Sequence, residues 1–483
     1  MSGIFRTNDP TQFDDVDGII IDESAPPANV QGAPANIGIL VAQFQRGPST
    51  LEEPGSIGDL FEQYGKSSYG GNLALKNKKF GRLKIIRVVA ADSVVAKEEF
   101  DSSSVDRIRF TAKQGNGVYG NSIQVKIEAG TTSGKKYTIH DASVSAVLPD
   151  EVYDNIAIAS VTTSTFGASR LVTATVLSSA AEPANTSGFV NLTGGSDGTI
   201  GDTDYQTAIA VAEVERAGNV LFLDAYNSTR NNYLKLHAAL TTDKMVICAG
   251  AEGDSVSDTK TAVASLRDTD GRIMYSYPWV ETSIDGVNVF VSPAPFLASV
   301  ITQTAPNIDP AFTENAKFLQ GITRLKLQLK RADYIQLKDA GVCSFELDED
   351  IGVVVKSGVT TQIINSSKVT ILRRRMADFL TDSLARFLKN YQGAVNSVEN
   401  RRDVKGGVIA FDEGLIRDKI LPADSEVKTG KARLIDTESL NTDSSVAAGF
   451  FKMIYKRRIY SSMRFIVLQA EIGESVVVTE GEA

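Results

Sequence analysis

The chain has 483 residues, a formal net charge of −9 and a pI near 5.1. That length is too great for one hydrophobic core and favours about three domains, and the acidic balance argues against a general nucleic-acid-binding protein, which needs a basic surface. No apolar run of about 18 residues predicts a membrane span, and no basic-then-apolar start predicts a signal peptide. Cys248 and Cys343 are too few for a disulfide scaffold and fit a reducing compartment.

The first 30 residues predict an extended arm rather than part of a core. Thr7–Asp17 is polar and acidic, and a proline pair stiffens the link that leads into the rest of the chain. Between them, Gly18–Asp22 is a short strand candidate. Its apolar residues Ile19, Ile20 and Ile21 have no obvious local partner. We expect this triplet either to be disordered or to dock elsewhere.

The next stretch has the pattern of an α/β crossover unit. Buried strands are predicted at Asn36–Phe44 and Leu83–Val89, with helices at Ser56–Gly65 and Asn72–Phe80 between them. This order predicts a partly parallel sheet. The pattern returns after residue 200. Helices are predicted there at Tyr205–Arg216, Arg230–Thr241 and Thr259–Leu266, and buried strands at Val220–Asp224, Met245–Ala249 and Val287–Val291.

The residues between these two stretches have a different character. Short strands are predicted at Asp106–Thr111, Ser122–Glu128, Lys136–His140 and Arg170–Leu177, separated by segments rich in Ser, Thr, Gly and Asn. Regular short strands with turn signals indicate a β-rich module. Because the α/β pattern resumes afterwards, we expect a peripheral β-rich domain inserted into an α/β core.

One amphipathic helix at Val369–Tyr391 organises the last part of the chain. Its apolar residues fall at steps of three and four, and Ser366 and Ser367 can cap its start. Strands near Val342–Leu347 and Val353–Val355 are predicted before it. A second helix at Ala447–Ile454 and a long strand at Arg457–Glu471 are predicted after it.

The polar face of that helix is basic. The segment 366–392 carries six cations against two acids, and a second basic run holds five cations and no acid: Lys452, Lys456, Arg457, Arg458 and Arg464. In an acidic chain this asymmetry indicates a surface that faces an acidic partner. A solvated helix face, or a contact with a neighbouring subunit, would give the same pattern. Arg375, Arg386 and Lys389 lie within roughly 60° of one another on the helix and are the best-aligned candidates.

Two motifs do not meet the structural conditions of the chemistry that they suggest. Gly115–Gly120 fits G-x-G-x-x-G, but an alternating pattern predicts a strand where a dinucleotide site needs a helix. Gly194–Gly198 fits G-x-S-x-G, which leaves a Ser196 hydrolase as the enzymatic alternative, with His140 or His237 as its base. A polar stretch separates Ser196 from the next predicted helix, so we expect no catalytic site.

The sequence also predicts neither a cofactor nor a metal site. The two histidines and two cysteines lie far apart, which argues against a transition-metal centre. Asp197, Asp202 and Asp204 could together hold a hard cation, but three acids on a Gly-rich loop are more often solvated.

A second apolar arm is predicted at the C-terminal end. Gly473 breaks the long predicted strand, and the patch Val476, Val477 and Val478 follows with no obvious local partner. Two apolar terminal strands on one chain are what strand addition between subunits requires. The candidate residues for this exchange are Ile19, Ile20, Ile21, Val476, Val477 and Val478.

Several short stretches, taken in order, resemble contractile phage tail sheath proteins. They are Asn36–Pro48 (an opening core strand and Arg-Gly-Pro turn), Ser56–Gly65 (a short helix), Gly120–Ile123 and Leu192–Gly198 (turns that bound an inserted module), and Ala340–Val342, Gly358–Thr361, Arg375 and Asp378 with the long helix (a C-terminal domain). Each motif is weak alone, and their order and spacing together carry the resemblance.

The resemblance implies an α/β and α+β multidomain fold. Its parts would be a subtilisin-like α/β core without a protease triad, a β-rich inserted domain, and a C-terminal α+β domain with exchanged terminal strands. The corresponding ranges are 1–30 for an N-terminal arm, 31–100 and 200–335 for the core, 101–199 for the insertion, 336–465 for the C-terminal assembly domain and 466–483 for a C-terminal arm.

The resemblance also implies a function without catalysis. Hexameric rings would stack around a tail tube and contract to drive the tube through the host envelope for genome delivery. The expected partners are other copies of the chain, the tail tube protein, the baseplate and the tail terminator, with no direct nucleic-acid contact and no membrane insertion. We expect assembly in the host bacterial cytoplasm and a final place in the virion tail, with Arg375, Arg386 and Lys389 facing the tube. A phage-related contractile injection system is the alternative within the same class.

Overall fold

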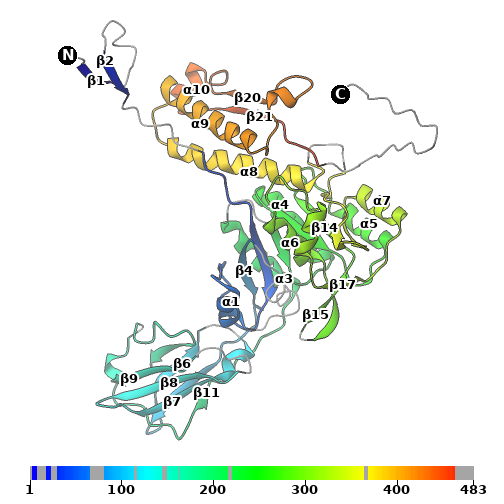
Figure 1. Ribbon diagram of the computed structural model, residues 1–483. Coiled ribbons are helices and arrows are strands. Elements are labelled where there is room, and N and C mark those ends of the chain that lie inside the picture. The colour runs from blue at the N-terminus through cyan, green and yellow to red at the C-terminus, as the bar shows by residue number, and fades with distance from the viewer. Residues whose placement is uncertain are drawn as a thin grey trace.

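The computed structural model describes residues 3–7, 18–22, 30–65, 81–113, 117–143, 149–162, 164–215, 220–284, 286–363 and 368–462. In Figure 1 a β-rich domain lies at the bottom, an α/β core in the middle and a helical layer, here called the platform, at the top. The predicted helix Asn72–Phe80 and the predicted capping residues Ser366 and Ser367 lie outside the described residues.

A seven-stranded sheet forms the centre of the core, in the order β19-β18-β14-β13-β12-β3-β4. Its strands are β3 (Ile37–Gln43), β4 (Arg82–Val88), β12 (Val220–Leu223), β13 (Met245–Ala249), β14 (Ile273–Tyr277), β18 (Cys343–Asp348) and β19 (Gly352–Val355). All neighbours pair in parallel except β18 and β19, which pair antiparallel. Parallel strands buried on both faces are apolar throughout, which is why the sequence pattern found most of them.

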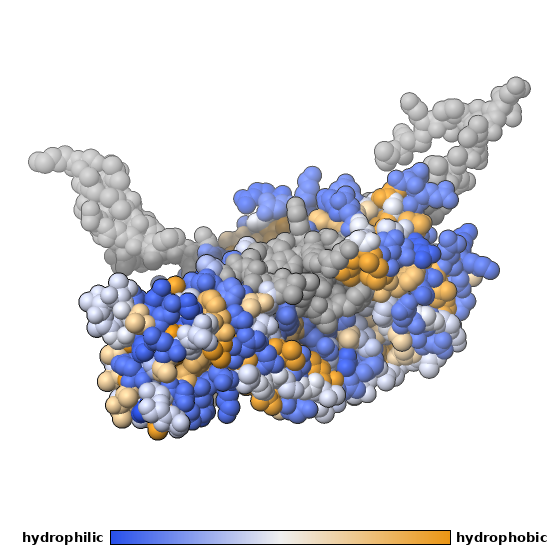
Figure 2. Space-filling model, turned by 90° about the horizontal axis from the view of Figure 1, so that it is seen from below, coloured by the Kyte–Doolittle hydropathy of each residue, from blue (hydrophilic) through white to orange (hydrophobic). Residues whose placement is uncertain are grey.

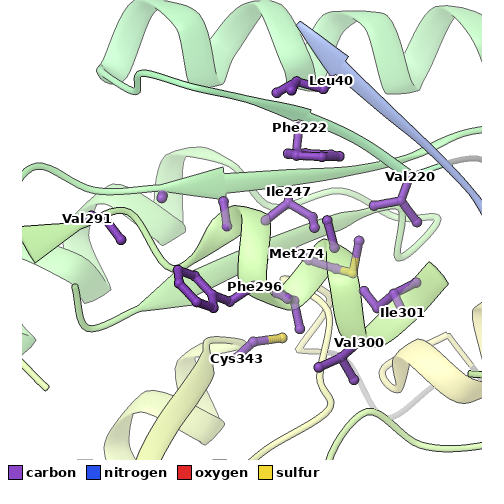
Figure 3. Packing of buried hydrophobic residues seen from close by; sticks show 14 of the residues in the cluster. Leu40, Val220, Phe222, Ile247, Met274, Val291, Phe296, Val300, Ile301 and Cys343 are labelled. Carbon is purple, nitrogen blue, oxygen red and sulfur yellow. The ribbon is translucent and has the colours of Figure 1, made fainter. Parts of the chain in front are cut away.

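Helices cover both faces of this sheet. Leu40, Phe222, Ile247 and Met274 point to one face, where they pack on α6 (Ala294–Gln303), as Figure 3 shows for its residues Phe296, Val300 and Ile301. The opposite face carries α3 (Asp202–Val211), α4 (Ser228–Thr241), α5 (Val256–Ser265) and α7 (Arg331–Ala340). Helix α1 (Ile57–Tyr64) lies between β3 and β4 in the chain. The sequence did not predict α6, because nine of its ten residues are buried and it has no polar stripe.

A separate three-stranded antiparallel sheet stands beside the core, in the order β16-β15-β17. Its strands are β15 (Val280–Ile284), β16 (Val287–Val291) and β17 (Ile322–Leu325). The prediction that Val287–Val291 is a buried strand is wrong in its burial, since Val287 is 62% exposed. The strand pairs within this outer sheet and not within the core sheet, so one of its faces stays in water.

The inserted domain consists of two small antiparallel sheets. One has β5 (Lys97–Ser102), β6 (Val105–Ala112) and β10 (Val172–Val176), and the other has β7 (Ile123–Ala129), β8 (Lys135–Asp141), β9 (Glu151–Ile156) and β11 (Val190–Asn191). Aromatic rings fill the space between them. Phe110 lies 5.7 Å from Tyr137 and 5.2 Å from Phe166, measured between ring centroids. All four strands predicted in this stretch are observed.

The platform consists of α8 (Ile371–Leu388), α9 (Val398–Arg417), α10 (Asp443–Ala447) and the two-stranded antiparallel sheet of β20 (Arg433–Asp436) and β21 (Ile454–Arg457). The predicted helix at Ala447–Ile454 is wrong, because α10 ends where that helix was to begin. The long strand predicted from Arg457 is wrong in its described part, since β21 ends at that residue and 458–462 form no strand. Its remainder lies outside the described residues.

The N-terminal arm contains a parallel pair of strands, β1 (Gly3–Thr7) and β2 (Gly18–Asp22), with Gly3 opposite Gly18. The strand prediction for Gly18–Asp22 is confirmed. The expected lack of a local partner is wrong, because β1 pairs with one edge of β2. At the other end of the core, β18 pairs with β14, so the first strand after residue 336 shares the core sheet rather than starting a new one.

Candidate functional site

Helix α8 connects the core to the rest of the platform. It begins one residue after Thr370, whose hydroxyl accepts a hydrogen bond from the backbone N–H of Arg373 at 3.4 Å, so Thr370 is the N-cap. Leu372, Met376 and Leu380 pack on the last turns of α9, and Leu384 and Phe387 pack on its earlier turns. The two helices therefore run antiparallel, and Figure 1 shows α9 above α8 and the core below it.

The first half of α8 is attached to the core by buried charges. Asp378 accepts hydrogen bonds from Arg272, the residue before β14, at 3.0 and 3.2 Å. Asp378 also pairs with Arg374 one helical turn before it. Arg374, one of the six cations in the predicted basic segment, is thus buried, with 9% of its surface exposed.

Arg375 is buried, with 5% of its surface exposed. Its guanidinium donates to the carbonyl oxygens of Ile301 and Thr304, both at 2.7 Å, and to that of Ala305 at 3.2 Å. These carbonyls belong to the C-terminal end of α6, where a helix leaves its last acceptors without intrahelical donors. Burial lowers the pKa of Arg375 to about 10, which still leaves it protonated at neutral pH.

The expectation that Arg375 lies on an exposed basic face is therefore wrong. Arg386 and Lys389, by contrast, are exposed at the far end of α8 and its 3₁₀ extension. Of the six cations in the predicted basic segment, Lys368 pairs with Asp270 at 2.5 Å, and Arg373 donates to Ser461. The surface charge of the helix is consequently concentrated in its outer half.

The N-terminal arm is joined to this outer half. The backbone N–H of Ala33 donates to the Ser383 hydroxyl at 2.8 Å, and Gly32 lies against the Phe379 ring so closely that a Cβ would meet it at 3.1 Å. Val30 packs on the apolar cluster that includes Leu384. Helix α8 therefore fixes the point from which the arm leaves the body of the molecule, which sequence periodicity gave no means of finding.

The second basic run is divided in the same way. Arg457 lies beside Asp412 of α9 at 3.5 Å and donates to the Pro422 carbonyl at 2.8 Å, while Arg458 donates to the Thr429 carbonyl at 2.7 Å. Lys452 and Lys456 are exposed. Arg464 and the predicted exchange residues Val476, Val477 and Val478 lie outside the described residues.

A second buried charge network joins the core to the inserted domain. Arg46, which follows β3, donates to Asp141 at 2.9 Å and to the Tyr119 hydroxyl at 2.7 Å, and the Tyr119 hydroxyl donates to Asp141 at 2.7 Å. Arg46 also donates to the Glu62 carbonyl of α1 at 3.1 Å. Burial raises the pKa of Asp141, but hydrogen bonds from Ser143 and Tyr119 and the charge of Arg46 outweigh it and hold that pKa below its ordinary value. The Arg-Gly-Pro turn noted in the sequence is thus a domain contact.

The residues proposed for hydrolysis are not assembled. Within the described residues, the Ser196 hydroxyl accepts from the Gly198 N–H at 3.3 Å and has no hydrogen bond with either histidine. His140 Nδ1 lies 2.6 Å from Asp150 in the inserted domain. His237 is buried in α4, where burial and the charge of Lys244 lower its pKa to about 4. The segment after Gly117 forms a short 3₁₀ turn and then β7, as the sequence predicted.

The candidate cation ligands also have other partners. Asp202 pairs with Arg230 at 2.7 Å, Asp204 accepts from the N–H of Gly201 at 2.8 Å, and Asp197 accepts from the N–H of Val118 at 2.9 Å. Across the described parts of the chain, no group of three or more His, Cys, Asp or Glu side chains is arranged to hold a metal ion. Nor does any helix in those parts have the length and apolar character to cross a membrane.

Two hollows in the described part of the chain lie beside the elements discussed above. One of about 240 Å³ lies in the platform where α8 ends, with Leu388, Tyr391 and Phe451 in its wall. The other, of about 490 Å³, lies where β3 and β4 end, near the junction with the inserted domain, and Arg87 and Asp197 line it. Where described residues form the underside of the molecule, polar and apolar residues are mixed (Figure 2).

The fold has close counterparts among solved structures. A sheath tail protein of Listeria innocua matches with a TM-score of 0.66 at 15% identity, over 89% of this chain and 93% of that one. A sheath tail protein of Desulfitobacterium hafniense matches with a TM-score of 0.57 at 16% identity, over 91% of this chain and 100% of that one.

A third counterpart was determined as part of an assembly. The helical sheath of the anti-feeding prophage, in its contracted state, matches with a TM-score of 0.58 at 13% identity, over 94% of this chain and 98% of its subunit. No family model and no curated protein sequence matches the chain. The likeness is therefore one of three-dimensional structure along nearly the whole length, and this chain has the fold of contractile tail sheath proteins.

Proposed function

We propose that this chain is the structural subunit of a contractile tail sheath. Copies would form hexameric rings stacked around a tail tube, and the stack would shorten to drive the tube through a host envelope. The observation that carries this proposal is the match over 94% of the chain to the subunit of a contracted helical sheath. A match that includes both the inserted domain and the platform supports a shared way of assembling, and not merely a shared α/β core.

The terminal arms would link the subunits. In this proposal β2, with Ile19, Ile20 and Ile21, and the C-terminal patch Val476–Val478 add to sheets of neighbouring copies. Two contacts support this proposal: Ala33, which follows the N-terminal arm, bonds to Ser383, and Ser461, which precedes the proposed C-terminal arm, bonds to Arg373. Ser383 and Arg373 are ten residues apart on α8, or about 15 Å along its axis. Between described strands, β20 and β21 pair only with each other, so each offers an outer edge to an incoming strand.

The exposed end of α8 would face the tube. Arg386 and Lys389 remain from the three residues first considered, since Arg375 is buried in the core contact. An exposed ion pair contributes only about 0–1 kcal/mol, but many copies around a tube would sum to a firm and reversible contact. Weak, screened contacts of this kind can be released in steps as the sheath shortens.

The proposal requires no catalysis, cofactor or metal. The energy of contraction would be stored in a metastable extended assembly, and the α/β core, subtilisin-like as the resemblance implies, would serve as a scaffold. The baseplate and tail terminator would bound the polymer, which would assemble in the host bacterial cytoplasm and end in the virion tail. A phage-related injection particle uses the same subunit mechanics, and gene neighbours that encode a head would favour the phage tail.

Electron microscopy of the purified protein, alone and with its tube protein, tests the proposal. Rings or tubes of stacked rings are the expected result. Single particles that never polymerise, together with esterase activity that Ser196→Ala abolishes, would instead establish the hydrolase.

A further inference from the structure

We infer that Arg375 is a positioning residue for assembly: by holding the C-terminal end of α6, it sets the direction of α8 and hence the place of the N-terminal arm root. This inference rests on the proposed function. It assigns Arg375 a role at a distance from the subunit interface, in place of the direct tube contact that its position on the helix suggested.

The start of α8 is fixed by backbone contacts that act as a pivot. The N–H of Ile371 donates to the Gly358 carbonyl at 3.1 Å, and Val359 forms an isolated bridge with Thr370. Ile371 itself is buried in the core cluster. These contacts hold one end of the helix but lie at a single point along its axis, so they leave its tilt to be set further on.

Arg375 supplies the second point. Its guanidinium reaches four acceptors around the end of α6, namely the carbonyls of Ile301, Thr304 and Ala305 and the Thr304 hydroxyl. The planar guanidinium carries five donors in a fixed fork, so it can satisfy several carbonyls at once only in a narrow range of orientations. The neighbouring pair of Arg272 and Asp378 holds the same side of the helix.

The point where the N-terminal arm joins α8 lies beyond the Arg375 contact, so a small tilt of the helix produces a larger displacement there. From Arg375 to Ser383, whose hydroxyl holds the arm root, the helix extends about 12 Å at 1.5 Å per residue. A tilt of about 15° would move that point by about 3 Å, which is more than half of the spacing between two paired strands. An arm whose root is displaced by that much would be out of line with the edge to which it has to add. Arg375 therefore contributes to the stability of the subunit through its hydrogen bonds, and to assembly through the direction that it gives to α8.

The test compares three variants of the full-length protein. Arg375→Met removes the donors while keeping a long apolar stem, and Arg375→Lys keeps the charge but loses the fork. Ile209→Ala is the matched control, because Ile209 is buried in α3 on the face of the core sheet opposite to α6. The tilt of α8 is measured as the distance between spin labels on two exposed positions, Thr261→Cys in α5 and Asn390→Cys beyond α8. Both native cysteines are buried, so the labels attach to the introduced ones.

In the Arg375→Met monomer we expect the distance between the labels to shift or broaden by about 5 Å, and we expect loss of polymer in light scattering. Arg375→Lys should show a smaller change in both readouts. Ile209→Ala should lower the melting temperature yet keep the label distance and the polymer. If Arg375→Met does not fold, Arg375→Lys carries the comparison. Wild-type label distances and normal polymers in the Arg375 variants would overturn the inference. A wild type that never polymerises would overturn the proposed function instead. The label distances would still test whether Arg375 sets the tilt of α8.

Discussion

The Asp141→Asn substitution tests whether the inserted domain is firmly joined to the core. The substitution preserves shape but removes the charge that faces Arg46, which is 1% exposed. Asp141 itself is 2% exposed and accepts from both Arg46 and Tyr119. Removing one partner of such a pair leaves an uncompensated buried charge, at a cost of about 3–5 kcal/mol. That is a large part of the roughly 5–15 kcal/mol that stabilises a typical domain.

The loss should appear on both sides of the contact. Arg46 also holds the Glu62 carbonyl, so we expect faster amide exchange in α1 as well as in β7 and β8. Hydrogen exchange by peptide suits this protein better than one melting temperature, because a chain with several domains need not unfold in a single step. The fluorescence of Trp279, the single tryptophan, reports the core separately.

Asp150→Asn is the matched control, since it removes the same charge from an exposed position in the same domain. A double variant, Arg46→Met with Asp141→Leu, removes both charges and should be more stable than Asp141→Asn alone, because neither partner is left unpaired. If Asp141→Asn changes exchange no more than Asp150→Asn does, then the network does not join the domains and the reasoning fails.

Four further outcomes are expected. Deletion of residues 1–22 should leave a folded monomer that does not polymerise, and normal polymers in light scattering would contradict strand exchange by this arm. Reversing the charges of Arg386 and Lys389 should weaken co-sedimentation with tubes, as high salt should in the wild type, without changing the melting temperature; unaltered binding at low salt would show that this end of α8 does not face the tube. The pKa of His237 is about 4 in the folded protein and about 6.5 in unfolded chains, so the free energy of unfolding should fall by up to about 2–3 kcal/mol as the pH falls from 6.5 to 4. Denaturation of the wild type and of His237→Gln at both pH values measures this fall, and an equal fall in the two proteins would refute it. Replacing residues 101–195 by a Gly/Ser link should keep the polymer but loosen α1, which loses the network around Arg46 on one side; insoluble protein would show that the inserted domain is part of the core.

The sequence by itself determined those elements whose cause is local. The strands β3, β12 and β13 are short apolar runs, and α8 has a regular apolar stripe, because the geometry of a buried strand or a half-buried helix dictates which positions are apolar. Helix α6 has no such stripe, since protein surrounds it on all sides. Helix α9 contains three glycines and many charges, so its helical period was obscured as well.

Tertiary structure decided which of the well-placed side chains reach the surface. Helical periodicity put Arg375 and Arg386 on similar sides of α8, but α6 ends against the first and nothing described covers the second. The partners of Arg375 lie 70 to 74 residues away in the chain, and Asp141 lies 95 residues from Arg46. Local chain geometry sets the direction in which a side chain points, whereas the packing of distant elements sets what it meets there, and only the folded chain contains that information.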